Sequence, residues 1–248
     1  MAVIVNADDF GKSEEVNKAI SEAFHRKFIA RTTLMVNMPY ADDAIKMALQ
    51  QGFADQVGIH LNLTEGRPLT EDIKSNPLFC DKDGNFHAFF HTTVKHRLYM
   101  DRYALGQIYK ELKTQLEKYN QYGLKLWHID SHHHVHTDYP VYCVLKRLSQ
   151  EYSFSSIRIS RNLYFGGNAL MRLYKKIYND SIKKLCRETT DLFGSYQDYE
   201  TYVKAGGGVP QQSTLEIMVH PMYREDGTLV DTDIPMVTEN LFGSLSDR

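Results

Sequence analysis

The sequence predicts an α/β protein in which helices cover a parallel sheet, either an open doubly wound sheet or a (β/α) barrel. Two observations support this class. Short apolar runs typical of buried strands alternate along the chain with longer segments of helical periodicity. Polar residues that could carry chemistry follow directly after four of these strands, as expected where reactive groups gather at the carboxyl ends of a parallel sheet.

The first quarter of the chain predicts three strands separated by two helices. Ser13 is the expected N-cap of the first helix, and Gly52 is the expected end of the second. The predicted strands cover residues 3–7, 32–36 and 57–62, and the predicted helices cover residues 13–28 and 40–50.

A long excursion over residues 63–101 interrupts this alternation. It contains Pro68, Pro77 and an Asp83-Gly84 turn, and it is too long for an ordinary connection, so we expect an inserted loop or lid. Helical periodicity then returns over residues 103–122 and stops before Gly123. The remaining predicted elements are a strand at 126–130, a helix at 140–152, a strand at 156–160, a helix at 168–184 and a strand at 215–219.

Length and composition favour one domain over residues 1–248. The 248 residues, 42% of them hydrophobic, suffice to bury one large core, and no Pro/Gly/Ser-rich linker divides them. The 29 basic and 31 acidic residues give a formal net charge of −2, which lacks the basic footprint of a duplex nucleic-acid binder. We therefore expect no nucleic-acid partner.

The cysteines and the first residues favour a cytoplasmic protein. Cys80, Cys143 and Cys186 are odd in number and far apart, which matches neither a disulfide framework nor a zinc knuckle. Residues 1–5 read as the start of a strand rather than as a secretory signal, and no stretch reaches membrane-spanning length. We expect free thiols, a reducing compartment and no membrane partner.

The densest chemistry lies at residues 128–136, where five of the eleven histidines surround Asp130. Each imidazole needs a partner for at least one nitrogen and tends to lose its charge when buried. The run is internal and is interrupted by Ser131 and Val135, unlike a purification tag. A divalent metal with oriented ligands would supply the partners, so the pattern favours a metal or catalytic role over a solvated His-rich loop.

Four predicted strands end in residues suited to metal binding or acid–base chemistry, namely Asp8 and Asp9, His60, His132 and His220. Adjacent carboxylates repel unless they are exposed or a cation or donor offsets the repulsion; capping of the next helix is the simpler alternative for Asp9. Because successive side chains of an extended strand point in opposite directions, we expect Asp8 and Asp9 to have different roles.

Four motifs follow one another along nearly the whole chain. They are Asn-Ala-Asp-Asp-Phe-Gly at 6–11, Gly-Ile-His-Leu at 58–61 with Leu-Thr-Glu-Gly-Arg-Pro-Leu at 63–69, His-Ile-Asp-Ser-His-His-His-Val-His at 128–136, and Glu-Ile-Met-Val-His-Pro at 216–221. Together they resemble the motifs of the YdjC-like carbohydrate deacetylases, which include the chitooligosaccharide deacetylases. The resemblance implies an irregular, TIM-type (β/α) barrel-like fold, a divalent metal, for which it points to Mg²⁺, and hydrolysis of N-acetyl groups on oligosaccharides. It places the family's metal histidines on His60 and His132 and its aspartate pair on Asp8 and Asp9.

The residue types at these positions can also supply each step of such a hydrolysis. Hydrolysis of an acetamide needs an activated water, a stabilised oxyanion and a proton for the departing amine. A metal held by Asp9, His60 and His132 would bind the water and polarise the acetyl oxygen; this donor set also suits Zn²⁺ or Mn²⁺. Asp8 is the expected general base, and His220 is the expected general acid because histidine titrates near neutral pH. The residues expected to orient the ligands are His128, Asp130 and His136.

Two other functions fit parts of this pattern. A metal-dependent phosphoesterase usually brings a second metal or an Arg/Lys clamp, and the glycines at 206–208 lack the following Lys-Ser/Thr of a phosphate loop. A non-catalytic sugar-binding module would need neither the aspartate pair nor His220. We therefore expect an enzyme that acts on a short, soluble N-acetylglucosamine oligosaccharide. Aromatic residues of the excursion could hold sugar rings, pack the loop onto the barrel or contact a second subunit in a homodimer; they are Phe79, Phe86, Phe89, Phe90, Tyr99 and Tyr103.

Overall fold

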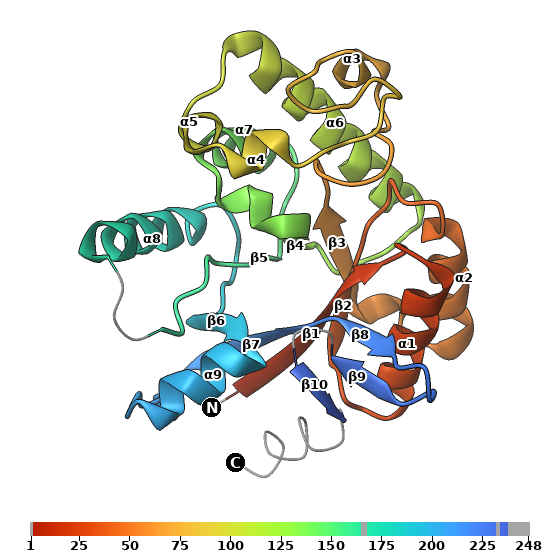
Figure 1. Cartoon of the computed structure of the whole chain (residues 1–248), viewed down its shortest axis with the longest axis vertical. Helices are drawn as coiled ribbons and strands as arrows, with labels where there is room; N and C mark the ends of the chain where they lie inside the picture. Colours follow the sequence, from red (N-terminus) through yellow and green to blue (C-terminus); the bar gives the residue numbers. More distant parts are fainter. Residues whose placement is uncertain (1, 165–167, 232–233, 238–248) are drawn as a thin grey trace.

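A computed structural model describes residues 2–164, 168–231 and 234–237 of the chain. Seven parallel strands form one curled, barrel-like sheet (Figure 1), in the order β5-β4-β3-β2-β1-β7-β6. Their bounds are β1 Ala2–Phe10, β2 Arg31–Leu34, β3 Val57–Leu61, β4 His128–Ser131, β5 Ser156–Ile157, β6 Leu192–Ser195 and β7 Thr214–Val219. From β1 to β5 each new strand is added on the same side of the sheet, as in a barrel, whereas a doubly wound sheet grows outward in both directions. The barrel-like prediction is confirmed.

The two ends of the sheet approach each other beyond β5 and β6. The Asn162 backbone N–H donates to the Phe193 carbonyl at 3.1 Å, and the Phe193 N–H donates to the Asn162 side-chain oxygen at 2.8 Å. These bonds join the segment after β5 to β6 and link the two ends of the curled sheet. The carboxyl ends of the strands therefore surround a common space.

The longer helices lie close to their predicted positions. They are α1 Glu14–His25, α2 Ala41–Gln51, α6 Arg102–Gln121, α7 Tyr139–Leu148 and α8 Ala169–Ile182. Ser13 caps α1 by accepting a hydrogen bond from the Val16 N–H at 3.2 Å. Gly52, with φ of 79°, ends α2 in the left-handed conformation that glycine adopts without strain. Within the described residues, no helix combines the length and apolar character needed to cross a bilayer.

The excursion over residues 63–101, which we call the 63–101 segment, folds against α6 and α7. It contains the short helices α3 Glu71–Lys74, α4 Phe89–Thr92 and α5 Val94–Leu98, which gather beside α6 and α7 in Figure 1. Glu111 of α6 is fully buried and accepts hydrogen bonds from the N–H groups of Leu69 and Thr70 at 3.0 and 2.8 Å. The segment is thus attached to the barrel at a defined point.

Several short elements were not predicted. The 3₁₀ helix η1 Ala54–Gln56 precedes β3, and η2 His132–Thr137 directly follows β4. Helix α9 Tyr196–Lys204 follows β6, and a small antiparallel sheet forms from β8 Pro221–Tyr223, β9 Leu229–Asp231 and β10 Ile234–Val237. Strand β5 is shorter than predicted, with two residues. The elements of three or four residues are too short to show a period in the sequence, whereas α9, with nine residues, was missed despite its length.

Candidate active site

The predicted site residues meet in one cavity at the carboxyl ends of the strands. The cavity has a volume of about 610 Å³, and its lining includes Asp8, Asp9, His60, His132 and His220. A larger hollow of about 890 Å³ lies between the C-terminal ends of α1 and α2, and its lining contains none of these five residues. The residues at the four strand ends therefore lie together in the smaller cavity, as predicted.

A break in the regular strand geometry of β1 brings both aspartates to this cavity. Pairing between β1 and β2 shifts register between Ala7 and Phe10, and Asp9 has a left-handed φ of 69°. The strict alternation expected of an extended strand is lost here, so both side chains line the cavity. A left-handed, non-glycine residue is strained, and such strain is typical of functional sites.

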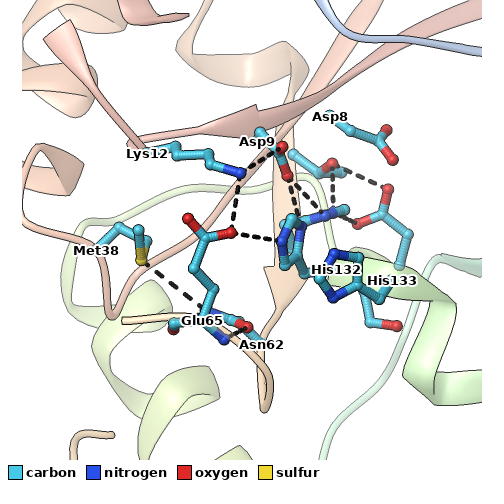
Figure 2. Close-up of polar contacts among 12 residues, drawn as sticks. Asp8, Asp9, Lys12, Met38, Asn62, Glu65, His132 and His133 are labelled. Carbon is cyan, nitrogen blue, oxygen red and sulfur yellow. Dashed lines mark hydrogen bonds and ion pairs between the residues drawn. The ribbon is translucent and has the colours of Figure 1, made fainter. Parts of the chain in front are cut away.

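The two carboxylates nevertheless have separate partners. Arg158 donates to both oxygens of Asp8, at 2.6 and 2.7 Å. Asp9 Oδ1 lies 2.8 Å from His132 Nδ1 and 3.3 Å from His60 Nε2, while Asp9 Oδ2 lies 3.4 Å from Lys12 Nζ. Asp8 is thus held by a fixed cation, whereas Asp9 faces two imidazoles. Figure 2 shows Asp9 beside Lys12 and His132.

Asp9, His60 and His132, which we call the Asp–His–His cluster, could hold a metal ion. All three are buried, and one ligand atom from each lies within 4.8 Å of the others. His60 Nδ1 lies 2.7 Å from Asp130 Oδ1, so a carboxylate orients the ring from the side away from Asp9, as is usual for metal-ligating histidines. One carboxylate oxygen and two imidazole nitrogens form a donor set that fits a divalent cation.

The electrostatics of the cluster favour a positive charge. Burial alone would lower the pKa of His60, but the carboxylates of Asp130, Asp9 and Asp8 together outweigh burial and raise this pKa to about 10. Burial alone would raise the pKa of Asp9, but hydrogen bonds from His132 and His60 hold it well below its usual range. A site that stabilises a proton on a buried imidazole to this extent would also stabilise a bound cation.

Arg158 and its carboxylate partners form a buried network that the sequence analysis missed. Its side chain is fully buried and also contacts Asp130 at 2.9 Å and Glu216 at 2.7 Å. Burial alone would raise the pKa of Asp8, but the Arg158 guanidinium together with the charges of His60 and His220 outweighs burial and holds that pKa well below its usual range. Arg158 interrupts the apolar Ile157 and Ile159 in the sequence, and a charge inside a buried-strand pattern is the signal that could have identified it.

The His-rich segment turns sharply after β4. His133 and His134 have left-handed φ values of 52° and 56°, so the chain is kinked within η2 immediately after His132. His136 contacts the Ser131 hydroxyl at 2.6 Å and the Arg158 carbonyl at 3.1 Å, and His128 contacts the Ser156 hydroxyl at 2.7 Å. Of the three residues expected to orient the ligands, Asp130 contacts a cluster histidine directly; His128 and His136 have these other partners.

His220 reaches the cavity from the end of β7. Its backbone N–H donates to Asp231 of β9 at 3.1 Å, which fixes the chain at this point. The charge of His220 also contributes to lowering the pKa of Asp8. His220 and the aspartate pair therefore share one cavity, although they are separated by more than two hundred residues of sequence.

The 63–101 segment supplies one wall of the cavity through Ala88, His91 and Thr92. His91, to which the sequence analysis gave no role, is held by Asp138 at 2.7 Å. The aromatic residues suggested as a sugar platform lie elsewhere: Phe79, Phe86 and Phe90 are buried in the core. Phe89, Tyr99 and Tyr103 are exposed and are not among the residues described as lining the cavity.

Glu65 is a second residue that the sequence analysis left without a role. Its carboxylate lies 2.8 Å from His132 Nε2 and 2.9 Å from Lys12 Nζ (Figure 2). Asn62 accepts hydrogen bonds from the Thr64 and Glu65 N–H groups at 3.0 and 3.1 Å. The loop after β3 thus places Glu65 on the opposite side of His132 from Asp9.

Comparison with known proteins gives a consistent result. A family model described as YdjC-like protein matches residues 2–240. A carbohydrate deacetylase of Clostridium beijerinckii is 30% identical over 234 residues, covering 92% of this chain and 84% of that protein. A carbohydrate deacetylase of Geobacillus stearothermophilus is 34% identical over 220 residues, covering 89% and 79%. The crystal structure of a candidate cellobiose-phosphate cleavage protein from Enterococcus faecalis V583 matches with a TM-score of 0.67 and 24% identity over 91% of this chain and 82% of that one, a likeness of fold.

Proposed function

This chain belongs to the YdjC-like protein family, and on that premise we propose that it is a divalent-metal-dependent hydrolase that removes acetyl groups from N-acetylated carbohydrates. One observation carries the proposal: the Asp–His–His cluster shares a cavity with a second carboxylate, Asp8, and with His220. The relatives named carbohydrate deacetylase support the same activity.

The residues divide into a metal-binding set and an acid–base pair. Asp9, His60 and His132 would hold the ion, which when bound supplies a Lewis acid for the water and the acetyl oxygen. Asp8 is the proposed general base. Arg158 keeps Asp8 in the ionised form that accepts a proton and fixes both of its oxygens. His220 is the proposed general acid that protonates the departing amine.

The substrate we propose is a short, soluble N-acetylglucosamine oligosaccharide. A cavity of about 610 Å³ is within the usual range for small-molecule sites, and its histidines, carboxylates and Lys12 suit a substrate rich in hydroxyl groups. We propose Mg²⁺ as the ion on the basis of the family resemblance, with Zn²⁺ and Mn²⁺ as metals the same donors accept. The cytoplasmic location and the homodimer stay predictions.

Acetate release from chitobiose, free and phosphorylated, tests the proposal. Protein loaded in turn with Mg²⁺, Mn²⁺ and Zn²⁺ should remove one acetyl group, as followed by mass spectrometry of the sugar. His220→Ala should abolish this loss if His220 protonates the amine. If the sugars stay intact with every metal and a phosphoester is hydrolysed rapidly, the result would instead favour a phosphoesterase.

A further inference from the structure

We propose that Glu65 is a positioning residue for His132, and that Lys12 holds Glu65 in place. This inference rests on the proposed metal site. The two imidazoles are arranged alike around one oxygen, Asp9 Oδ1, which lies 2.8 Å from His132 Nδ1 and 3.3 Å from His60 Nε2. The remaining nitrogen of each ring faces a second carboxylate, Asp130 for His60 at 2.7 Å and Glu65 for His132 at 2.8 Å.

The outer carboxylates determine which nitrogen of each ring is available to a cation. A neutral imidazole carries one N–H, and the nitrogen without the proton is the one that binds a metal. A carboxylate that accepts the N–H fixes both the tautomer and the plane of the ring. Glu65 therefore leaves His132 Nδ1 facing Asp9, just as Asp130 leaves His60 Nε2 facing Asp9.

The two outer carboxylates are held in different ways. Asp130 is fully buried and is fixed by the Thr33 hydroxyl at 2.9 Å and by Arg158 at 2.9 Å. The Glu65 side chain is 38% exposed, so its position depends on Lys12, whose Nζ lies 2.9 Å from Glu65 Oε2. His132 is therefore the imidazole whose orientation can be changed without disturbing the core.

The backbone around Glu65 is also fixed. Asn62 Nδ2 donates to the Glu65 carbonyl at 2.7 Å and Asn37 Nδ2 donates to it at 3.2 Å. Gly66 has φ of +72°, and an added Cβ would come within 2.6 Å of Met38 Sδ, so a side chain at residue 66 is disfavoured both by conformation and by contact. This rigid loop aims the Glu65 carboxylate at His132.

Metal affinity of Glu65 variants tests the inference. Binding of Mg²⁺ and Mn²⁺ to metal-stripped protein would be measured by titration calorimetry and chelator competition. Glu65→Ala should weaken binding about 10- to 100-fold, the usual effect of losing such a partner. Glu65→Gln should weaken it less, because the amide oxygen still accepts from the His132 N–H. The matched control is Glu71→Ala on α3, where Glu71 is exposed and pairs with Lys74; it should leave affinity unchanged.

Three outcomes would overturn the role of Glu65. Unchanged affinity in Glu65→Ala would show that His132 needs no partner. Equal losses in Glu65→Gln and Glu65→Ala would indicate that the carboxylate binds the ion directly. Nitrogen-15 spectra of the Zn²⁺-loaded protein should show the His132 proton on Nε2, and a proton on Nδ1 would reverse the assignment. Circular dichroism would verify that the variants are folded.

Lys12→Gln tests the second half of the inference. Removing this anchor should reduce metal affinity by a smaller factor than Glu65→Ala, because Glu65 can still reach His132. Lys18→Gln is the control, since Lys18 is exposed and pairs with Glu14. Tighter metal binding in Lys12→Gln would overturn this role and show that Lys12 acts mainly by repelling the ion from Asp9, 3.4 Å away. The wild-type protein could release no acetate while metal affinity still falls from wild type to Glu65→Gln to Glu65→Ala. In that case the proposed deacetylation fails and the positioning role of Glu65 stands.

Discussion

Asp8 and Asp9 are adjacent in sequence but differ in what surrounds them. Asp8 is paired with the fixed guanidinium of Arg158, at 2.6 and 2.7 Å, whereas Asp9 faces the imidazoles of the Asp–His–His cluster. Arg158 balances the charge of Asp8 and keeps it ionised, which is the form that the proposed general base requires. Asp9 has an oxygen between two nitrogens that can bind a cation. The left-handed backbone of Asp9 allows neighbouring residues to occupy these two positions.

Substitution of each aspartate should therefore have a different effect. Asp8→Asn should retain the metal but reduce turnover by about 10²- to 10⁴-fold, the range for removal of a general base. Asp9→Asn should weaken metal binding, because the amide has lost the negative charge. Elemental analysis and acetate-release rates distinguish the two effects. Loss of the ion in Asp8→Asn with retention in Asp9→Asn would reverse the roles.

The two cluster histidines should be replaceable without loss of the fold. In His60→Ala, Asp130 keeps its contacts with Thr33 and Arg158, so no isolated buried charge remains. Both His60→Ala and His132→Ala should lose most of the bound divalent ion and of the activity, while circular dichroism stays near that of the wild type. Full metal occupancy in both variants would exclude these histidines as ligands.

At the scale of elements, periodicity predicted the long helices and the strands that carry the site. Long amphipathic segments repeat the same pattern several times, and end signals such as Ser13 and Gly52 act locally, so both can be read from the sequence. The strand end also predicted where Asp9, His60 and His132 would meet. A charge inside a buried strand could have identified Arg158, but its pairing with Asp8 and the pairing of Glu65 with His132 could not be predicted, because they depend on the curvature of the sheet and the path of a loop.

The short elements after β5 were missed for a related reason. Strand β6 has four residues and includes Gly194, where an added Cβ would lie 2.9 Å from the Asp198 side chain. The apolar content of β6 is too low to indicate a strand. At Gly194 the backbone itself packs closely against its neighbour, so no apolar side chain marks the position in the sequence. Tertiary contacts rather than local preference therefore determine this part of the sheet.

The 63–101 segment should detach more readily from the barrel when Glu111, which holds it, is replaced. Glu111 is fully buried and accepts three hydrogen bonds from Leu69 and Thr70. Glu111→Ala should destabilise the protein by on the order of 3 kcal/mol, because partly buried donors lose a charged acceptor. It should also raise the KM for the sugar, since Ala88, His91 and Thr92 form a wall of the cavity.

Limited proteolysis would check this effect on the segment. Cleavage within residues 63–101 should become faster in Glu111→Ala and stay unchanged in Glu117→Ala, a replacement of an exposed glutamate on the same helix. Equal cleavage in both variants would mean that the apolar core under the segment, including Phe79 and Phe90, is a sufficient anchor.

At the scale of the whole molecule, one arginine connects four strands. Arg158 follows β5 and contacts Asp8 of β1, Asp130 of β4 and Glu216 of β7. Arg31 adds a second cation, 3.2 Å from Glu216. Burying these charges is costly, and replacing one partner of a buried pair typically costs about 3–5 kcal/mol. The buried charges thus lower the stability of the barrel interior but form a rigid network beneath the site.

The same interior should make the protein sensitive to acid. Burial lowers the pKa of His136 to about 3, outweighing the opposing charge of Asp130, and burial also lowers the pKa values of His128 and His134. An unfolded histidine titrates at about 6.5. Below that pH the unfolded chain takes up protons that the folded protein does not, so the free energy of unfolding falls as pH drops from about 6.5 towards 3.

Urea unfolding of metal-free protein at about pH 6 and pH 5 would measure this dependence. The range lies above the ordinary pKa values of aspartate and glutamate, so histidines dominate it. Each histidine kept neutral by the fold contributes at most about 1.4 kcal/mol per pH unit, and His136→Gln should reduce the slope by roughly that amount. His25→Gln, which replaces an exposed histidine at the end of α1, is the control. A wild-type slope in His136→Gln would show that His136 takes up its proton in the folded state, and that the contacts with Ser131 and the Arg158 carbonyl do not keep it neutral.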